Sequence, residues 1–286
     1  MTHRSFAVVT GANSGVGFEA TRILAREGRA VVMVCRSRDR GEAARQRILQ
    51  ETPGAELLVE GCALDSLSQV RELAGRLDAL LARDGRELGA LVNNAGLYRA
   101  PLERTEDGFE RTLAVNHLSH FLLTLLLERR LRRPEARVVN VSSGGHRAGR
   151  LDRRPVGEIL RGEGPYNGWR AYADSKLAQV LFTRELHRRW GPDGMLAFAV
   201  HPGVLSTAIW DRNRTFAMWM VGFLKPFMDT PEVGGDAVAR LVTDAEAAEA
   251  AGGYFRKRER EEPAPLARDE ALGRRLWEAS AEAVEL

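Results

Sequence analysis

The 286-residue sequence has little cysteine, little lysine and no long apolar run. Its two cysteines, Cys35 and Cys62, lie within apolar strand-like runs, so we expect small buried thiols in a reducing compartment and no disulfide or metal site. No run reaches the roughly 18 apolar residues that span a bilayer, and residues 1–6 lead into a strand without a signal peptide. We therefore expect a cytoplasmic protein without an integral membrane segment. The 42 basic residues are 39 arginines and three lysines, Lys176, Lys225 and Lys257.

Charge balance limits the class of partner. The 42 basic residues face 39 acidic ones, and the two signs are interleaved along the chain, so the formal net charge is only +3. Blocks of basic residues, which are typical of nucleic-acid binding, are not prominent. Nucleic acid is therefore not an expected partner, and the arginine excess is interpreted as coding bias.

Short apolar runs alternate along the chain with amphipathic helical patterns. Expected strands cover residues 6–10, 30–35, 55–64, 90–93, 137–141 and 195–200. Expected helices cover residues 18–27, 40–51, 68–82, 109–128 and 172–190. Continuous apolar strands alternating with helices favour a doubly wound parallel sheet in a three-layer α/β/α single domain over residues 1–286. The last thirty residues are charged and are expected to be peripheral.

A glycine-rich turn follows the first expected strand, with the sequence Thr10-Gly11-Ala12-Asn13-Ser14-Gly15-Val16-Gly17. Glycines allow a tight turn and a close backbone approach, so that amides at the helix N-terminus can hold a pyrophosphate. On this signal alone, a plain turn between strand and helix fits equally well.

The spacing T-G-x-x-x-G-x-G, together with three other motifs, resembles the short-chain dehydrogenase/reductase family. The other motifs are Asn93-Asn94-Ala95-Gly96, Tyr172-Ala-Asp-Ser-Lys176 and His201-Pro202-Gly203. The resemblance covers residues 5–245 and implies a Rossmann fold, a nicotinamide cofactor and hydride transfer between that cofactor and a carbonyl or alcohol. Three features, the long gap from Ser143 to Tyr172, the arginine after the second strand and a Val-Asn-His-Leu sequence, resemble the retinol-dehydrogenase-like and protochlorophyllide-reductase-like branch.

The resemblance also implies which residues contact the cofactor. They are Gly11, Asn13, Ser14, Gly15, Val16, Gly17, Arg36, Ser37, Asp65, Asn93, Ala95, Gly96, Tyr172, Lys176, Pro202, Gly203, Val204 and Thr207. An acidic residue after the second strand would bind the ribose 2′-OH of NAD, but this sequence has Arg36-Ser37-Arg38 there, which suits the 2′-phosphate of NADP. NADP(H) is thus the preferred cofactor and NAD(H) stays open. Asp65, which matches an adenine-side position, also fits a helix N-cap.

Tyr172 and Lys176 are one helical turn apart, on one face. Carbonyl reduction needs a proton donor, and a nearby cation favours a lowered phenol pKa. The resemblance assigns Tyr172 as acid/base and Lys176 as the cation and ribose ligand. It assigns Ser143 to the substrate oxygen, with Ser142 as the neighbour to check. It assigns Asn116 to a helix bend that anchors a water.

Two segments are expected to shape the substrate pocket: an irregular insertion at residues 151–169 and a flap at residues 205–235, rich in Met, Trp and Phe. They favour a lipophilic small-molecule carbonyl or alcohol, with core packing, or contact with a membrane surface or partner, as alternatives for the flap. Long helices pairing across a two-fold axis would give a homodimer. A cofactor-binding scaffold without turnover and a nucleotide-sugar epimerase or dehydratase are the competing functions. Three histidines are expected to be structural and not metal ligands: His117, His120 and His146.

Overall fold

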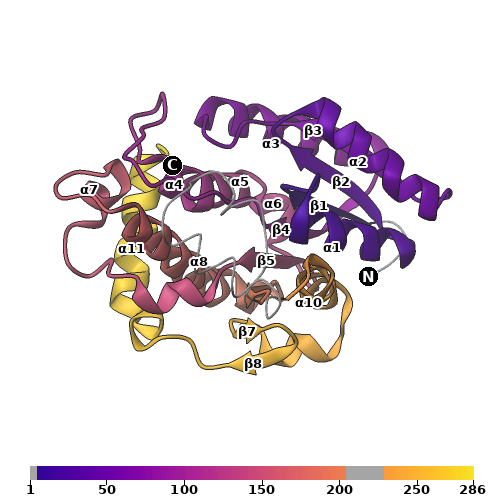
Figure 1. Cartoon of the computed structure of the whole chain (residues 1–286). Helices are drawn as coiled ribbons and strands as arrows, with labels where there is room; N and C mark the ends of the chain where they lie inside the picture. The colour runs from indigo at the N-terminus through magenta and orange to yellow at the C-terminus, as the bar shows by residue number, and fades with distance from the viewer. Residues whose placement is uncertain (1–4, 204–228) are drawn as a thin grey trace.

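The computed structural model describes residues 5–203 and 229–286. Through this described part runs one eight-stranded sheet with the order β3-β2-β1-β4-β5-β6-β7-β8 (Figure 1). Neighbouring strands pair in parallel from β3 to β7, and β8 pairs antiparallel with β7. The strands are β1 Ser5–Thr10, β2 Ala30–Cys35, β3 Leu57–Gly61, β4 Glu87–Asn93, β5 Arg137–Val141, β6 Leu196–His201, β7 Tyr254–Arg256 and β8 Glu259–Glu261.

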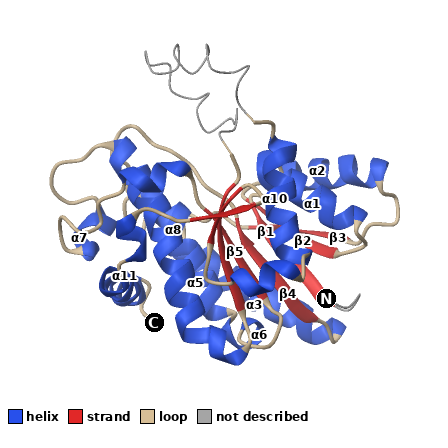
Figure 2. Ribbon diagram, turned by 90° about the horizontal axis from the view of Figure 1, so that it is seen from below, coloured by secondary structure: helices blue, strands red, loops and turns tan. Residues whose placement is uncertain are grey.

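Helices cover both faces of the sheet (Figure 2). One face packs against α1 Gly15–Arg26, α2 Arg38–Glu51 and α10 Pro231–Thr243. The other packs against α3 Leu67–Asp84, α5 Ser119–Leu126 and α8 Gly168–Trp190. Shorter helices are α4 Arg111–Leu113, α6 Glu128–Leu131 and α7 Val156–Arg161. The predicted doubly wound, three-layer α/β/α fold is confirmed.

The central strands are apolar throughout because both of their faces are buried. In β2, Val31 belongs to the core under α1 and α2, while Val32 belongs to the core under α3 and α5. Cys35 and Cys62 are both free and buried, and burial raises their pKa to about 11 and about 12. The prediction of small buried thiols is thus confirmed.

The C-terminal segment is not peripheral, and that expectation is wrong. Helix α11, Glu270–Ala283, packs against α8 and α7, with Leu272 and Leu276 fully buried. Its Ser280 Oγ lies 2.8 Å from Nε2 of the buried His117. An apolar stripe at helical spacing outweighs the charged composition, because only the opposite side of the helix needs to face water. No helix in the described part of the chain is both long and apolar enough to cross a membrane.

The fold brings the predicted motifs to one edge of the sheet. The glycine-rich turn follows β1, and the other motif segments follow the carboxyl ends of β2, β4, β5 and β6 or begin α8. The strand order reverses between β1 and β4, where open α/β sheets form their ligand crevice. The position of a cofactor site is therefore set by the topology.

Candidate active site

The glycine-rich turn is packed tightly against the loop that follows β4. Gly11 and Gly15 have φ values of 66° and 56°, in the left-handed region that favours glycine. A Cβ on Gly17 would lie 2.4 Å from Asn94 Nδ2 and 2.5 Å from the Gly11 carbonyl oxygen. Ser14 at the α1 N-cap makes no side-chain cap, and the first turn holds no acidic residue. The helix N-terminus therefore keeps the amide donors and positive potential that suit a phosphate.

The two asparagines after β4 have different contacts. Asn94 Nδ2 donates to the Thr10 carbonyl at 2.7 Å, and the amides of Asn94 and Ala95 donate to Thr10 Oγ1 at 2.9 and 3.0 Å. Asn93 is fully buried, and its Nδ2 lies 2.8 Å from Asn140 Oδ1 on β5. The prediction of Asn93 as a cofactor contact is therefore wrong for its side chain, because that amide is bonded inside the core. Asn94, which was not among the predicted cofactor contacts, holds the glycine-rich turn in place.

Two arginines stand at the end of β2 as expected. Arg36 and Arg38 are exposed, and no ion pair joins either to a carboxylate in the described ranges. Ser37 lies between them at the α2 N-cap, and its Oγ accepts from the Arg40 amide at 3.3 Å. The Ser37 hydroxyl still has its own proton to donate. The three side chains together supply charge and donors that fit a phosphate monoester.

Asp65 is not the helix cap. Its carboxylate pairs with the Arg111 guanidinium, which also lies 2.9 Å from Glu103, and the hydrogen bond to Asp65 is the main cause of the raised pKa of Arg111. Ser66 occupies the N-cap of α3, and the Asp107 carboxylate accepts from the first amide of that helix at 3.0 Å. The cap interpretation is thus wrong, and the adenine contact of Asp65 stays a prediction.

The candidate catalytic side chains meet where β5 ends beside α8. The Ser143 hydroxyl and the Tyr172 ring border the same glycine, since a Cβ on Gly145 would lie 3.6 Å from Ser143 Oγ and 3.4 Å from Tyr172 Cε1. The Ser143 hydroxyl also accepts from the Gly145 amide at 3.2 Å. Ser142 points elsewhere: it is buried, and its Oγ donates to the Lys176 carbonyl at 2.8 Å. Ser143 is therefore the serine placed beside Tyr172.

Burial governs the ionisation of Tyr172 and Lys176. Burial raises the pKa of the Tyr172 phenol, which is only 6% exposed, and the Ser143 hydrogen bond acts in the opposite direction. Burial also lowers the pKa of Lys176 to about 8. Lys176 Nζ donates to the Val141 carbonyl at 2.9 Å and lies 5.8 Å from the centroid of the Tyr172 ring. The expected net lowering of the Tyr172 pKa is not met in this structure, because the cost of desolvating a phenolate is the largest effect and raises the pKa.

Asn116 lies in a π-helical turn, Ala114–Leu118, that interrupts the helix expected over residues 109–128. Asn116 Oδ1 accepts from the Leu97 amide at 2.8 Å, and its Nδ2 donates to the Leu97 carbonyl and to Ser175 Oγ, both at 3.0 Å. The predicted distortion of the helix at Asn116 is confirmed. The wider turn lets this side chain hold the loop after β4, and its predicted water stays a prediction.

His120 connects the π-helical turn to the glycine-rich turn. Its Nε2 lies 3.0 Å from Thr10 Oγ1, and its Nδ1 lies 3.2 Å from the Asn116 carbonyl. Burial lowers its pKa to about 3, so the ring is neutral near pH 7. His120 is thus structural, as expected, but it joins two segments of the candidate site.

His146 is bonded to the backbone of the candidate catalytic serine. Its Nε2 accepts from the Ala264 amide at 3.1 Å, so Nδ1 holds the proton and donates to the Ser143 carbonyl at 2.8 Å. Burial lowers its pKa, which favours this neutral form. The His146 ring also packs on Tyr254, with centroids 4.7 Å apart. The C-terminal segment thereby supports the position of Ser143.

An ion pair that the sequence did not indicate lies beside the loop after β6. Gly203 has φ of 111°, and a Cβ there would lie 2.5 Å from Asp229 Oδ2. Lys257 Nζ lies 2.6 Å from Asp229 Oδ1. One otherwise unexplained lysine thus fixes the carboxylate beside Gly203, next to Pro202. Outside the described residues lie Val204, Thr207, Lys225 and flap residues 205–228.

Aromatic rings surround Tyr172. Tyr98 meets it edge-on, with centroids 6.2 Å apart and planes at 86°, and Trp169 stacks on it at 5.7 Å and 28°. Trp169 ends the insertion at residues 151–169, which includes α7 and so is not wholly irregular. The insertion does reach the candidate site, as expected.

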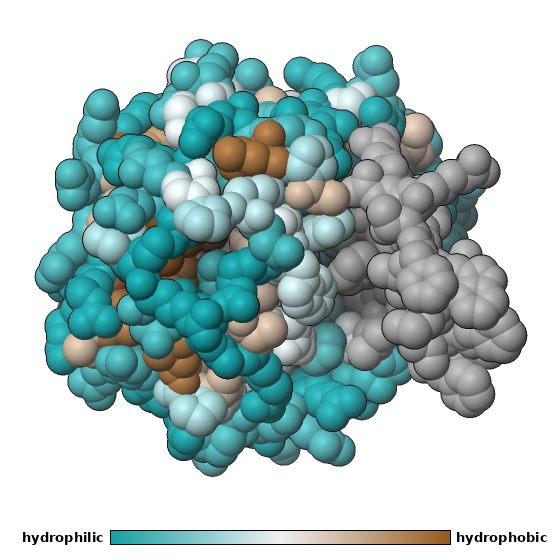
Figure 3. Space-filling model, turned by 60° about the vertical axis from the view of Figure 1, so that its left-hand side comes forward, coloured by the Kyte–Doolittle hydropathy of each residue, from teal (hydrophilic) through white to brown (hydrophobic). Residues whose placement is uncertain are grey.

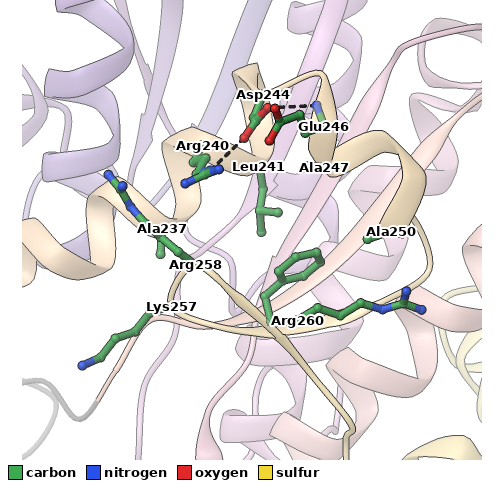
Figure 4. A pocket seen from close by; sticks show the side chains of 11 residues that line it. Ala237, Arg240, Leu241, Asp244, Glu246, Ala247, Ala250, Lys257, Arg258 and Arg260 are labelled. Atoms are coloured by element: carbon green, nitrogen blue, oxygen red, sulfur yellow. Dashed lines mark hydrogen bonds and ion pairs between the residues drawn. The ribbon is translucent and has the colours of Figure 1, made fainter.

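A separate surface cavity of about 200 Å³ lies between α10 and the C-terminal strands (Figure 4). Arg240 on its wall pairs with Asp244 at 2.7 Å, and Arg258 pairs with Asp236. None of its lining residues was predicted to bind cofactor or substrate. The candidate active site is therefore defined by side-chain contacts at the sheet edge, and not by this cavity.

Comparison with known proteins gives consistent matches. A family model described as short chain dehydrogenase matches residues 5–153. The chain is 38% identical to human (Homo sapiens) retinol dehydrogenase 13 over 285 residues, with 98% of this chain and 84% of that protein covered. It is 40% identical to the Bos taurus dehydrogenase/reductase SDR family member 13, covering 96% of this chain and 71% of that protein.

Solved structures show the same fold. An uncharacterised protein from Mycobacterium paratuberculosis superposes with a TM-score of 0.74 at 30% identity, covering 99% of this chain and 94% of that chain. A short chain dehydrogenase from Burkholderia cenocepacia, solved with NADP, superposes with a TM-score of 0.69 at 24% identity, covering 88% and 95%.

Proposed function

The chain belongs to the short chain dehydrogenase family, and we propose that it is an NADP(H)-dependent oxidoreductase acting between the carbonyl and alcohol forms of a lipophilic small molecule. The observation that carries this proposal is the placement of Ser143 beside Tyr172, around Gly145, with Lys176 one helical turn further along α8. A buried phenol beside a hydroxyl can hold and protonate an oxygen atom, which a purely cofactor-binding scaffold does not need.

The proposed cofactor site uses residues that fit a dinucleotide. The N-terminus of α1 would hold the pyrophosphate, and Arg36 with Ser37 would hold a 2′-phosphate. Arg36 is exposed and directly follows β2, at the position where NAD-specific folds place a carboxylate. The NADP-bound family structure supports this preference, and NAD(H) stays the alternative.

When bound, NADPH supplies a hydride to the carbonyl carbon. The Ser143 hydroxyl and the Tyr172 phenol hold the carbonyl oxygen between them. As negative charge develops on that oxygen, the Tyr172 O–H gives up its proton and the alcohol is complete. The raised Tyr172 pKa keeps the phenol protonated before the reaction, and the Lys176 ammonium stabilises the phenolate left behind. The reverse sequence oxidises an alcohol.

A lipophilic substrate is proposed from the aromatic rings beside Tyr172 and from relatives named retinol dehydrogenases. The Met and aromatic residues of the predicted flap also support a lipophilic substrate, on the basis of the sequence alone. A cytoplasmic location and pairing into a homodimer stay predictions of the sequence.

The test measures NADPH consumption over a panel of aldehydes, ketones and quinones. Tyr172→Phe should lower turnover by about a hundredfold or more while NADPH binding persists, since a positioned general acid contributes 10²–10⁴-fold. If the wild-type protein binds NADPH without turnover of any panel member, the scaffold function replaces the enzymatic one.

A further inference from the structure

We infer that Trp169 is a specificity-determining residue, which offers an aromatic surface to the group attached to the reacting carbon and so favours aryl aldehydes and ketones. The inference rests on the proposed function, since it concerns the substrate of that site. It begins from Gly145, whose missing side chain leaves space at the site. A Cβ there would lie 3.4 Å from Tyr172 Cε1, 3.6 Å from Ser143 Oγ and 3.7 Å from Trp169 Cη2.

The edge of the Trp169 indole therefore borders the same space as the Ser143 and Tyr172 side chains. Because Ser143 and Tyr172 would hold the carbonyl oxygen, the group bonded to the carbonyl carbon must lie within a few ångströms of them. Trp169 Cη2 borders that space. The glycine at position 145 keeps the space open.

Trp169 is also unusually exposed for its size. The residue is 45% accessible, and within the described ranges only Val233 and Leu286 are comparable large apolar residues, at 39% and 53%. The face of the described residues seen in Figure 3 is mostly hydrophilic, with scattered apolar side chains. An indole that stacks on the candidate catalytic tyrosine and is exposed on this scale presents apolar surface beside the candidate site.

The position of Trp169 is fixed by its neighbours in the chain. A Cβ on the preceding Gly168 would lie 2.2 Å from the Arg99 carbonyl oxygen, so the start of α8 packs directly on the loop after β4. Tyr166 donates to Glu110 Oε1 at 3.0 Å, and the other oxygen of this fully buried carboxylate accepts from the Leu113 amide at 2.7 Å.

These contacts hold the chain directly before the indole. A preorganised ring loses little freedom when a ligand stacks on it. Tyr98, edge-on to Tyr172, borders the same site from the loop after β4. The arrangement suits a flat aromatic ring better than a puckered saturated one, because only an aromatic ring can make the edge-to-face or offset-stacked contacts that aromatic pairs prefer.

The experiment compares benzaldehyde with cyclohexanecarbaldehyde, which have the same carbon skeleton but a flat and a puckered ring. The measured quantity is the ratio of their kcat/KM values with NADPH, in wild type, Trp169→Phe and Trp169→Leu. Intrinsic differences in aldehyde reactivity cancel when variants are compared. Trp169→Leu should reduce the preference for benzaldehyde about two- to tenfold, since aromatic pairs contribute beyond their buried area. Trp169→Phe should retain most of the preference.

Two more variants test whether the effect comes from the space beside Trp169. Gly145→Val should raise KM for both aldehydes by filling the space between the three side chains. Arg153→Ala, an exposed substitution on the same insertion, is the control and should leave the ratio unchanged. An unchanged ratio in Trp169→Leu, with turnover intact, would overturn the inference and leave the proposed function standing. Absence of turnover with every carbonyl in wild type would overturn both.

Discussion

The lowered pKa of Lys176 leads to a quantitative prediction about activity at alkaline pH. Its ammonium is fully buried, and desolvation lowers the pKa from 10.5 to about 8. If the protonated form is needed, kcat/KM for NADPH should be constant below pH 8 and then fall about tenfold for each pH unit. At pH 9 roughly a tenth of the activity should remain, because this parameter reports the ionisation of the free enzyme.

The same titration changes the stability of the folded state in the opposite direction from the activity. Between pH 8 and 10.5 the unfolded chain binds more protons at this lysine than the native chain does, so the contribution of Lys176 to stability increases as pH rises. A loss of activity above pH 8 would therefore not reflect unfolding at this group. Thermal unfolding monitored over the same pH series separates the two effects.

Lys176→Arg provides the control. A guanidinium stays protonated above pH 12, so this variant should have lower kcat but no activity loss centred near pH 8. The assay is the initial rate of NADPH oxidation from pH 6.5 to 10. A wild-type profile that is flat to pH 10 would refute the reasoning, and so would an unchanged alkaline loss in Lys176→Arg, which would assign the titration to another group.

Three further predictions concern the cofactor site and the support of Ser143. Arg36→Asp should shift the NADPH/NADH ratio of kcat/KM towards NADH by about tenfold or more, and an unchanged ratio would exclude the 2′-phosphate contact. Gly17→Ala should destabilise the fold by about 1–3 kcal/mol, through the contacts at 2.4 and 2.5 Å, and weaken NADPH binding. Its control is Gly75→Ala on α3, where a Cβ meets nothing within 4 Å and thermal unfolding should not fall. His146→Leu should lower kcat more than it changes KM for NADPH, and equal effects on both would point to a general loss of structure.

The sheet could be predicted from the sequence because its strands are buried on both faces. Runs such as Ala30–Cys35 are continuously apolar, and their alternation with helical segments determines the parallel order. Strands β7 and β8 were not predicted, since they are three residues long and polar in part. The charged composition of the C-terminal segment hides helix α11, whose core contact is indicated only by the helical spacing of Leu272 and Leu276.

The candidate site was predictable where a motif fixes a residue and not where the contact is made across the fold. The strand period could have identified Asn93 as a core residue, since Leu91 two positions earlier faces the same buried layer. No local pattern joins His146 to Ala264, which are 118 residues apart. The raised pKa of Tyr172 was unpredictable for a related reason: burial is a property of the packed fold, and the spacing of Tyr172 and Lys176 does not report it.

The most direct test of the central claim follows the hydride itself. NADPH bearing deuterium at the transferable position of nicotinamide C4 is incubated with the protein and an aldehyde, and the alcohol product is analysed by mass spectrometry. The account predicts one deuterium on the carbinol carbon in wild type and little alcohol with Tyr172→Phe. Alcohol without deuterium, or equal product from Tyr172→Phe with NADPH binding intact, would contradict it.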